Sequence, residues 1–281
     1  SGGKSGFSAA IDVAPAIDPF RSPIAVNRSA GVTRAVVAPE TAGNIFAGQG
    51  AIMDLGADSD ALTKARAFQF VELGENGAAS AGGSRSSAHL LFRAMFREAQ
   101  DFATGRDAFD DGLLRAEDAK VLQSVLRGEQ RLLVRAEAAN DILRVLELKR
   151  DYPAIKMVLV GVSEGWRVAD RIAASGVPVI ASALNDLPAT FELLGATQSN
   201  IGRMKDAGVK VSIGMIDDRD SHQLRYTTQY AGNLVSLQKV PRATGLSWDE
   251  AFAAISSGPA EAMGMGDKLG SLKAGRVGDV V

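Results

Sequence analysis

Residues 157–183 read MVLVGVSEGWRVADRIAASGVPVIASA, and this stretch decides the fold. Two short apolar runs, 157–162 and 177–181, enclose a segment with the polar and apolar spacing of an amphipathic helix. A glycine-containing stop at Ser175-Gly176 ends that segment and leads directly into the second run. This order is typical of a strand, a crossover helix and a second, parallel strand.

The same pattern extends outward along the chain. Further apolar runs lie at residues 31–38, 132–137 and 209–214, and helices are expected over 138–150, 164–174, 200–207 and 247–257. Near-continuous apolar strands are what a parallel sheet covered on both faces requires. The sequence therefore predicts a repeating βα fold with a parallel sheet, which either closes into a barrel or is doubly wound.

Two regions interrupt this rhythm. Residues 43–58 are glycine-rich around a short apolar centre, so we expect a hairpin or excursion there rather than a barrel strand. Residues 78–87 are small and polar, which predicts a loop, and helices are expected over 86–104 and 116–126.

Composition sets the class of protein. The 281 residues include 46% hydrophobic and 23% charged residues, as in an ordinary soluble globular protein. The net charge of −2 gives no reason to expect nucleic acid or an anionic membrane as partner, and no run approaches the roughly 20 apolar residues of a membrane span. The polar opening at residues 1–6 is no signal peptide, and the chain is expected to begin within a longer protein. The absence of cysteine excludes disulfides and fits a cytoplasmic or a periplasmic location equally.

The carboxyl-terminal stretch carries the first family resemblance. Residues 247–255 (SWDEAFAAI) and 258–264 (GPAEAMG) resemble the last barrel helix and the Asn-Pro-Ala turn of the amidohydrolase superfamily, with Gly258 where asparagine is common. Residues 269–281 (LGSLKAGRVGDVV) resemble the family segment GSL-x-x-GK-x-ADLVV. In relatives, that segment returns the chain to a small β-sandwich beside the barrel.

Upstream stretches resemble the imidazolonepropionase-like branch of this superfamily, in the same order along the chain. The stretches are residues 31–33, 38–39, 46–51, 73–76, 84–85, 140–142, 163–170 and 230–233. The resemblance implies an α/β fold, a TIM-like (β/α)8 barrel of the metal-dependent hydrolase type. Residues 1–268 would form the barrel and 269–281 the start of the β-sandwich return. The first strand and most of the sandwich would lie outside this chain.

Histidine is scarce where that family usually binds metal. The His-x-His pair of the first strand would precede Ser1, whereas the later ligand positions correspond to Arg135-Ala136-Glu137 and to Gly161. Arginine has no lone pair to give and glycine has no side chain, so neither holds a metal. We therefore assign no metal ligand in this chain, and expect zinc or a similar divalent ion only if the missing first strand supplies ligands.

The turn after residues 209–214 retains the family's aspartate. Residues 214–218 (GMIDD) resemble its G-T-D turn, shifted by one residue. The resemblance implies that Asp217 or Asp218 takes a proton from the attacking water. The alternative is that Asp217, Asp218 and Asp220 form a solvated acidic loop.

Six other polar residues are candidates: Arg135, Glu137, His222, His89, Glu164 and Glu75. Arg135 and Glu137 leave one strand two residues apart, so they point the same way and are expected to pair across the vacated metal position or to contact substrate. His222 is a candidate substrate contact, or else a loop residue. His89, in a helix, is expected to be structural or exposed, and Glu164 is expected to support a helix N-terminus.

Two functions remain open from the sequence. One is hydrolysis of C–N bonds in amides or cyclic amides, as the family resemblance implies. The other is a metal-free, catalytically inactive barrel that binds a small molecule or a protein partner. A small-molecule ligand is expected in both, a homo-oligomer is left open, and the substrate cannot be read because specificity resides in loops.

Overall fold

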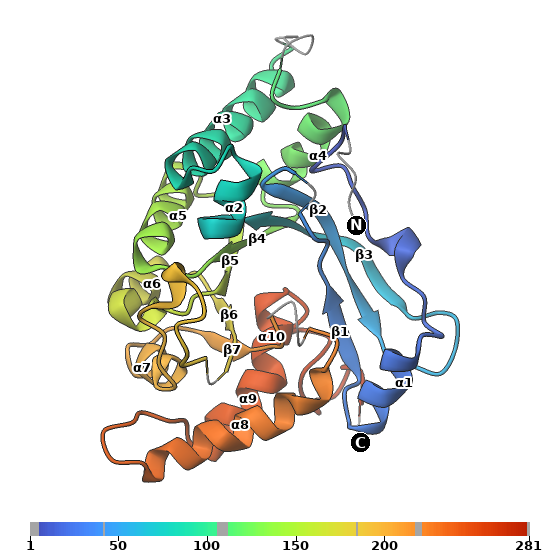
Figure 1. Ribbon diagram of the computed structural model, residues 1–281. Coiled ribbons are helices and arrows are strands. Elements are labelled where there is room, and N and C mark those ends of the chain that lie inside the picture. Colours follow the sequence, from blue (N-terminus) through green and yellow to red (C-terminus); the bar gives the residue numbers. More distant parts are fainter. Residues whose placement is uncertain (1–5, 42, 106–111, 184, 217–220, 280–281) are drawn as a thin grey trace.

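The computed structural model describes residues 6–41, 43–105, 112–183, 185–216 and 221–279. Its centre is one seven-stranded sheet in which the strands lie side by side in chain order. The strands are β1 (Arg34–Val37), β2 (Phe46–Asp54), β3 (Leu62–Glu72), β4 (Arg131–Ala136), β5 (Lys156–Gly161), β6 (Val179–Ala181) and β7 (Val211–Ile213). Strands β1, β2 and β3 pair antiparallel, and β3 to β7 pair parallel. The sheet curls along its length (Figure 1).

Helices follow the parallel strands. The helices are α1 (Ser22–Ser29), α2 (Gly74–Ser80), α3 (Arg85–Ala103), α4 (Ala116–Leu126), α5 (Ala139–Asp151), α6 (Ala169–Ser175), α7 (Asn200–Asp206), α8 (Thr227–Ser236), α9 (Trp248–Ile255) and α10 (Ser257–Ala262). Local signals fix several ends. Ser247 and Glu250 form a capping box at the start of α9, and Gly176 ends α6 in the left-handed conformation.

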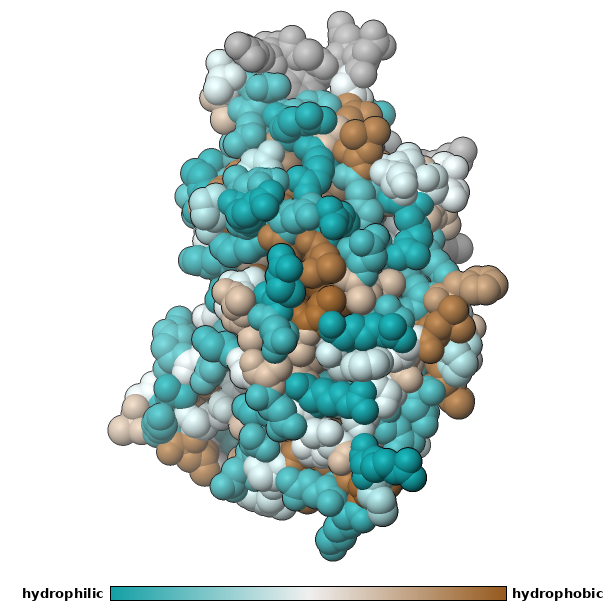
Figure 2. All heavy atoms as spheres, turned by 90° about the vertical axis from the view of Figure 1, so that its left-hand side faces the viewer, coloured by the Kyte–Doolittle hydropathy of each residue, from teal (hydrophilic) through white to brown (hydrophobic). Residues whose placement is uncertain are grey.

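Both faces of the parallel strands are buried, which explains their apolar sequences. Leu132 and Val134 of β4 point outward into the core shared with the helices, together with Phe92 and Ile142. Leu133, between them, points to the inner face, where it belongs to a second cluster that includes Phe68, Phe70 and Met263. Figure 1 shows α3, α5, α6 and α7 along the outer side of the sheet. The outer face of these helices presents mainly hydrophilic residues, with small apolar patches between them (Figure 2).

The strand register brings side chains from distant segments to one edge. Glu72 of β3 pairs with Arg135 of β4, and Ala136 of β4 pairs with Gly161 of β5. Because these strands are parallel, their carboxyl ends meet at this edge. In βα folds of this kind, ligand sites form there.

An α/β fold with a curled, parallel-rich sheet is thus confirmed, but a complete (β/α)8 barrel is not. The described residues form a TIM-like half-barrel of five parallel strands with an antiparallel hairpin at one side. Residues 43–58, expected to form a hairpin or excursion, contain the single strand β2, which is part of the sheet and pairs antiparallel with β1 and β3.

Two local expectations were wrong, and one strand was missed. The run at 31–38 contributes β1, which is antiparallel and only partly buried, because its one described sheet neighbour is β2. The loop at 78–87 is partly helical, because α2 continues to Ser80. Strand β3 was not expected, because Lys64 and Arg66 make its exposed first half polar. Only its second half has the pattern of a buried strand.

Residues 269–279 form no strand. Asp279 instead makes an ion pair with Arg34 of β1, at 2.8 Å. The boundary between barrel and β-sandwich at residues 268 and 269 stays a prediction. Within the described ranges, no helix is long and apolar enough to cross a membrane.

Candidate functional site

A group of paired charges lies at the carboxyl ends of β3, β4 and β5. We call Glu72, Arg135, Glu137 and Ser163 the Arg135 cluster. Arg135 donates from Nη1 to Glu72 Oε1 at 3.3 Å and from Nε to Glu137 Oε1 at 3.2 Å. The side chains are 17% exposed for Arg135 and 9% for each glutamate. One guanidinium thus bridges two mostly buried carboxylates that come from neighbouring strands.

The remaining oxygens of both carboxylates also accept hydrogen bonds. Glu137 Oε2 accepts from the Ser163 backbone N–H at 3.1 Å and from its hydroxyl at 2.7 Å. Thr41 donates its hydroxyl to Glu72 Oε2 at 2.9 Å, and Asn185 Nδ2 donates to Ser163 Oγ at 3.2 Å. The cluster is therefore a connected network, which is the condition for charged groups to be stable out of water.

Gly161 makes room for this network. Its φ of +88° lies in the left-handed region. A Cβ at this position would overlap the Glu137 carboxyl group, which supplies its three nearest atoms, all closer than 3.0 Å. The Glu137 carboxylate therefore occupies the space that a side chain at position 161 would need.

These residues do not fit the divalent metal that the fold family implies. A guanidinium and a glycine stand at two strand-end positions, and both nearby carboxylates already have a positive partner. Among the described residues, no group of three or more histidine, cysteine, aspartate or glutamate side chains is arranged to hold a metal ion.

A second carboxyl group, Glu192, faces the same strand ends from the segment between β6 and α7. It lies in a short 3-10 turn, Phe191–Leu193, and Oε2 accepts from the Glu75 backbone N–H at 2.9 Å, in the first turn of α2. The pKa of Glu192 is raised to about 7. Burial is the main cause, and the nearby acids Glu137, Glu75 and Asp141 add to it, whereas that hydrogen bond acts in the opposite direction. Glu192 therefore exchanges its proton near neutral pH.

Asp141, in the first turn of α5, is the opposite case. Burial alone would raise its pKa, but hydrogen bonds and charges from His89 and Arg85 hold the pKa below its ordinary value. His89 Nε2 lies 2.9 Å from Oδ1, and Arg85 donates to Oδ2. Adjacent carboxyl groups with pKa values moved in opposite directions are characteristic of acid–base sites.

The structure brings together some of the predicted residues and not others. Arg135 and Glu137 form the expected ion pair. Asp217 and Asp218 lie outside the described residues. His222 is exposed, and its backbone carbonyl accepts from Asn27 of α1 at 2.9 Å, so it is not placed in the Arg135 cluster. His89 binds Asp141, which gives it a structural contact.

Glu164 supports a helix N-terminus, as expected, but that of α5 and not that of the helix it was expected to begin. Its Oε2 accepts from the Ala139 backbone N–H at 3.0 Å, at the start of α5. Glu72 and Glu192 were missed by sequence reasoning. Glu72 ends an apolar run, which is a usable signal, whereas Glu192 lies in an irregular segment and carries none.

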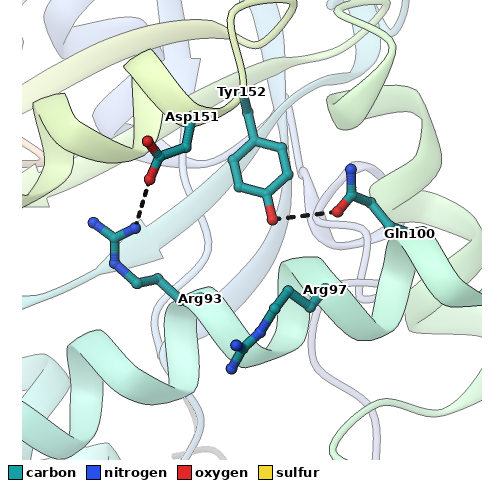
Figure 3. A pocket seen from close by; sticks show the side chains of 5 residues that line it. All are labelled: Arg93, Arg97, Gln100, Asp151 and Tyr152. Carbon is teal, nitrogen blue, oxygen red and sulfur yellow. Dashed lines mark hydrogen bonds and ion pairs between the residues drawn. The ribbon is translucent and has the colours of Figure 1, made fainter.

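A cavity of about 310 Å³ lies elsewhere, between α3 and the end of α5. Figure 3 shows its lining residues, with Arg93 paired to Asp151 at 2.9 Å and Tyr152 donating to Gln100 at 3.3 Å. Tyr152 leads into the amino end of β5, so this cavity is at the opposite end of the strands from the Arg135 cluster. It is a polar hollow of the outer helix layer.

Comparison with known proteins bears on the family and the fold. Residues 151–281 match the profile of the amidohydrolase family. This match covers a little less than half of the chain, 131 of its 281 residues. A 77-residue stretch is 39% identical to the amidohydrolase tasK of Hapsidospora irregularis, covering 25% of this chain and 8% of that protein. The chain therefore spans a small part of this relative's length.

A solved structure shows the fold over nearly the whole chain. The crystal structure of an amidohydrolase from Thermotoga maritima MSB8 superposes with a TM-score of 0.82 and 18% identity, covering 97% of this chain and 72% of that one. The chain therefore shares the fold of that structure over nearly its whole length, including the part before residue 151. Membership of the imidazolonepropionase-like branch stays a prediction.

Proposed function

We propose that the protein is a hydrolase of C–N bonds in small amides or cyclic amides, with its site at the carboxyl ends of β3 to β7. The amidohydrolase domain and fold support the reaction class. The observation that carries the proposal is Glu192, a half-buried carboxyl group with a pKa of about 7 at those strand ends. A group that titrates near the working pH is the most effective general acid or base.

In this proposal Glu192 moves the proton. Its carboxylate accepts a proton from the water that attacks the amide carbonyl carbon, and the carboxylic acid returns that proton to the leaving nitrogen. The C–N bond breaks, and one water is consumed to give an acid and an amine.

The remaining predicted site residues keep proposed roles. Arg135 and Glu137 would contact the substrate from β4, and His222 would contact it from the segment after β7. Asp217 or Asp218 would supply a further general base. No step passes through a metal, because the described strand ends do not fit one.

Turnover of a panel of N-acyl amino acids and of five- and six-membered cyclic amides tests this function, with products identified by mass spectrometry. For a substrate that turns over, Glu192→Gln should lower kcat/KM by about 100-fold or more, because general-base catalysis is lost. The wild-type kcat/KM should rise with pH up to about 7 and then level off, as the Glu192 carboxylate forms. That rise should disappear in the variant.

The matched control is Glu117→Gln, which removes an exposed carboxylate in the first turn of α4. It should leave kcat/KM and its pH profile unchanged. An unaltered pH profile in Glu192→Gln would remove Glu192 from the chemistry.

A second candidate function has its own observation. The Arg135 cluster is already satisfied, as in a barrel that binds a small molecule without converting it. Thermal stabilisation by members of the same panel, with no product from any of them, would favour this binding function over hydrolysis.

A further inference from the structure

We infer that Arg135 is a built-in replacement for a divalent cation: its guanidinium neutralises Glu72 and Glu137, so that the described strand ends take up no divalent metal. The inference concerns metal binding and stability, and does not depend on whether the protein hydrolyses amides. It follows from how the two carboxylates are held.

Glu72 and Glu137 need a positive partner. They come from neighbouring strands, each is 9% exposed, and both contact the same guanidinium. Two mostly buried carboxylates that face one position repel each other strongly unless a cation lies between them. In metal-dependent hydrolases a divalent ion can neutralise such a pair of carboxylates. Here a permanently charged side chain neutralises the pair and, unlike a metal ion, cannot exchange with the solvent.

The positions of Arg135, Glu137 and Gly161 depend on one another. The Glu137 carboxylate reaches Arg135 across the space above Gly161. Any side chain at position 161, including a metal-binding one, would displace Glu137 from the guanidinium. Arg135, Glu137 and Gly161 therefore act as one unit that excludes a metal ligand at two strand ends together.

Removing the Arg135 guanidinium should leave the Glu72 and Glu137 carboxylates without their shared positive partner. Carboxylate oxygens are the ligands that hard ions such as Mn²⁺ prefer. The variant Arg135→Met keeps a long apolar side chain and removes the charge, so Glu72 and Glu137 would face each other without a counter-ion. Their affinity for Mn²⁺ then becomes measurable as thermal stabilisation.

The test uses the full chain, with Tm measured in EDTA and in excess MnCl2, and bound metal measured by elemental analysis. The wild-type protein should hold no stoichiometric metal and keep the same Tm in both. Arg135→Met should lose about 5–10 °C in EDTA, the range expected for breaking a mostly buried ion pair, and MnCl2 should restore part of this loss.

Arg131→Met is the matched control on the same strand. Arg131 lies at the amino end of β4 and donates to the Ala262 carbonyl at 2.8 Å, so its loss also removes a partly buried guanidinium. This variant should lower Tm without any response to MnCl2.

Stoichiometric metal in the wild-type protein, or a Tm that EDTA lowers, would overturn the inference. Two results with Arg135→Met would also overturn it: a Tm equal to that of the wild type, or a lowered Tm that MnCl2 does not raise. If Arg135→Met does not fold, the response of Tm to MnCl2 is measured in Arg135→Lys instead. This variant keeps a cation, so MnCl2 should leave its Tm unchanged. None of these readouts depends on turnover, so their failure is separable from failure of the proposed hydrolysis.

Discussion

Two groups of carboxylates at the same strand ends differ in how their charge is compensated. In the Arg135 cluster, Glu72 and Glu137 share a guanidinium and also accept from hydroxyl and backbone donors. Glu192 accepts one backbone N–H and has acidic neighbours. The first group has a cationic partner, whereas burial and acidic neighbours raise the pKa of Glu192.

Asp141 shows that burial alone does not decide this difference. It is more buried than Glu192, but His89 and Arg85 lower its pKa, whereas burial and acidic neighbours raise the pKa of Glu192. The identity of the partner therefore separates the structural carboxylates from the one suited to proton transfer. Three substitutions test this distinction.

The largest effect on stability is expected from Gly161→Ala. The new Cβ would overlap the Glu137 carboxylate and would require a left-handed alanine, so the free energy of unfolding should fall by about 3 kcal/mol or more. Urea unfolding measures this loss. Gly176→Ala is the matched control, because Gly176 also has a positive φ but no atom within 4 Å of a Cβ. It should cost only about 1 kcal/mol.

The double variant Glu137→Ala/Gly161→Ala separates overlap from backbone strain. If the Glu137 carboxylate fills the space above Gly161, the two losses should be clearly less than additive. Additive losses would show that the Arg135 cluster does not depend on Gly161.

A smaller effect on stability is expected from Asp141→Asn. It removes a carboxylate that accepts from His89 and Arg85, so unfolding should become easier by about 2 kcal/mol at neutral pH. Because the folded pKa of Asp141 is below its ordinary value of 3.8, the stabilisation that it provides is present above that pH and is lost as the pH falls further.

The variant Asp141→Asn should also lower the pKa of Glu192. The negative charge of Asp141 is one cause of the raised Glu192 pKa, so its removal should shift that titration toward acid, which NMR of the carboxyl carbon can follow. A Glu192 titration that does not move would show that the two carboxyl groups are not coupled.

The smallest effect is expected from Glu192→Gln on stability. A folded-state pKa raised to about 7 means that protonation favours folding, so the wild-type protein loses this contribution as pH rises from about 4.5 to 7. At pH 8 the neutral variant should therefore be more stable than wild type by about 1 kcal/mol, a value reduced for solvent screening. Below about pH 4 the difference should vanish. A variant that is less stable at pH 8 would contradict the unfavourable charge assigned to Glu192.

The parallel strands were predictable because their burial leaves a plain sequence pattern. Residues 132–134 and 157–162 are apolar on both faces, and the structure buries them on both faces of β4 and β5. The run at 31–38 has similar composition, but pairing with β2 determined its direction and exposure. Strand direction depends on partners that a local pattern does not contain.

The site was predictable only where it follows strand geometry. Arg135 and Glu137 are two residues apart on one strand, so period-two alternation places them together. Glu192 approaches Glu75 across 117 residues of chain, from an irregular segment whose path is set by tertiary packing. The raised pKa of Glu192 depends on this packing, and the neighbouring residues in the sequence do not indicate it.

The order of the strands bears on how the chain acquires its structure. Each strand of the described sheet pairs with the strand that follows it in the chain, from β1 to β7. A ribosome-bound chain could thus extend the sheet one strand at a time, without waiting for a distant partner to be synthesised. The Arg135 cluster would assemble in the same sequence, since β3, β4 and the segment after β5 supply its residues in that order.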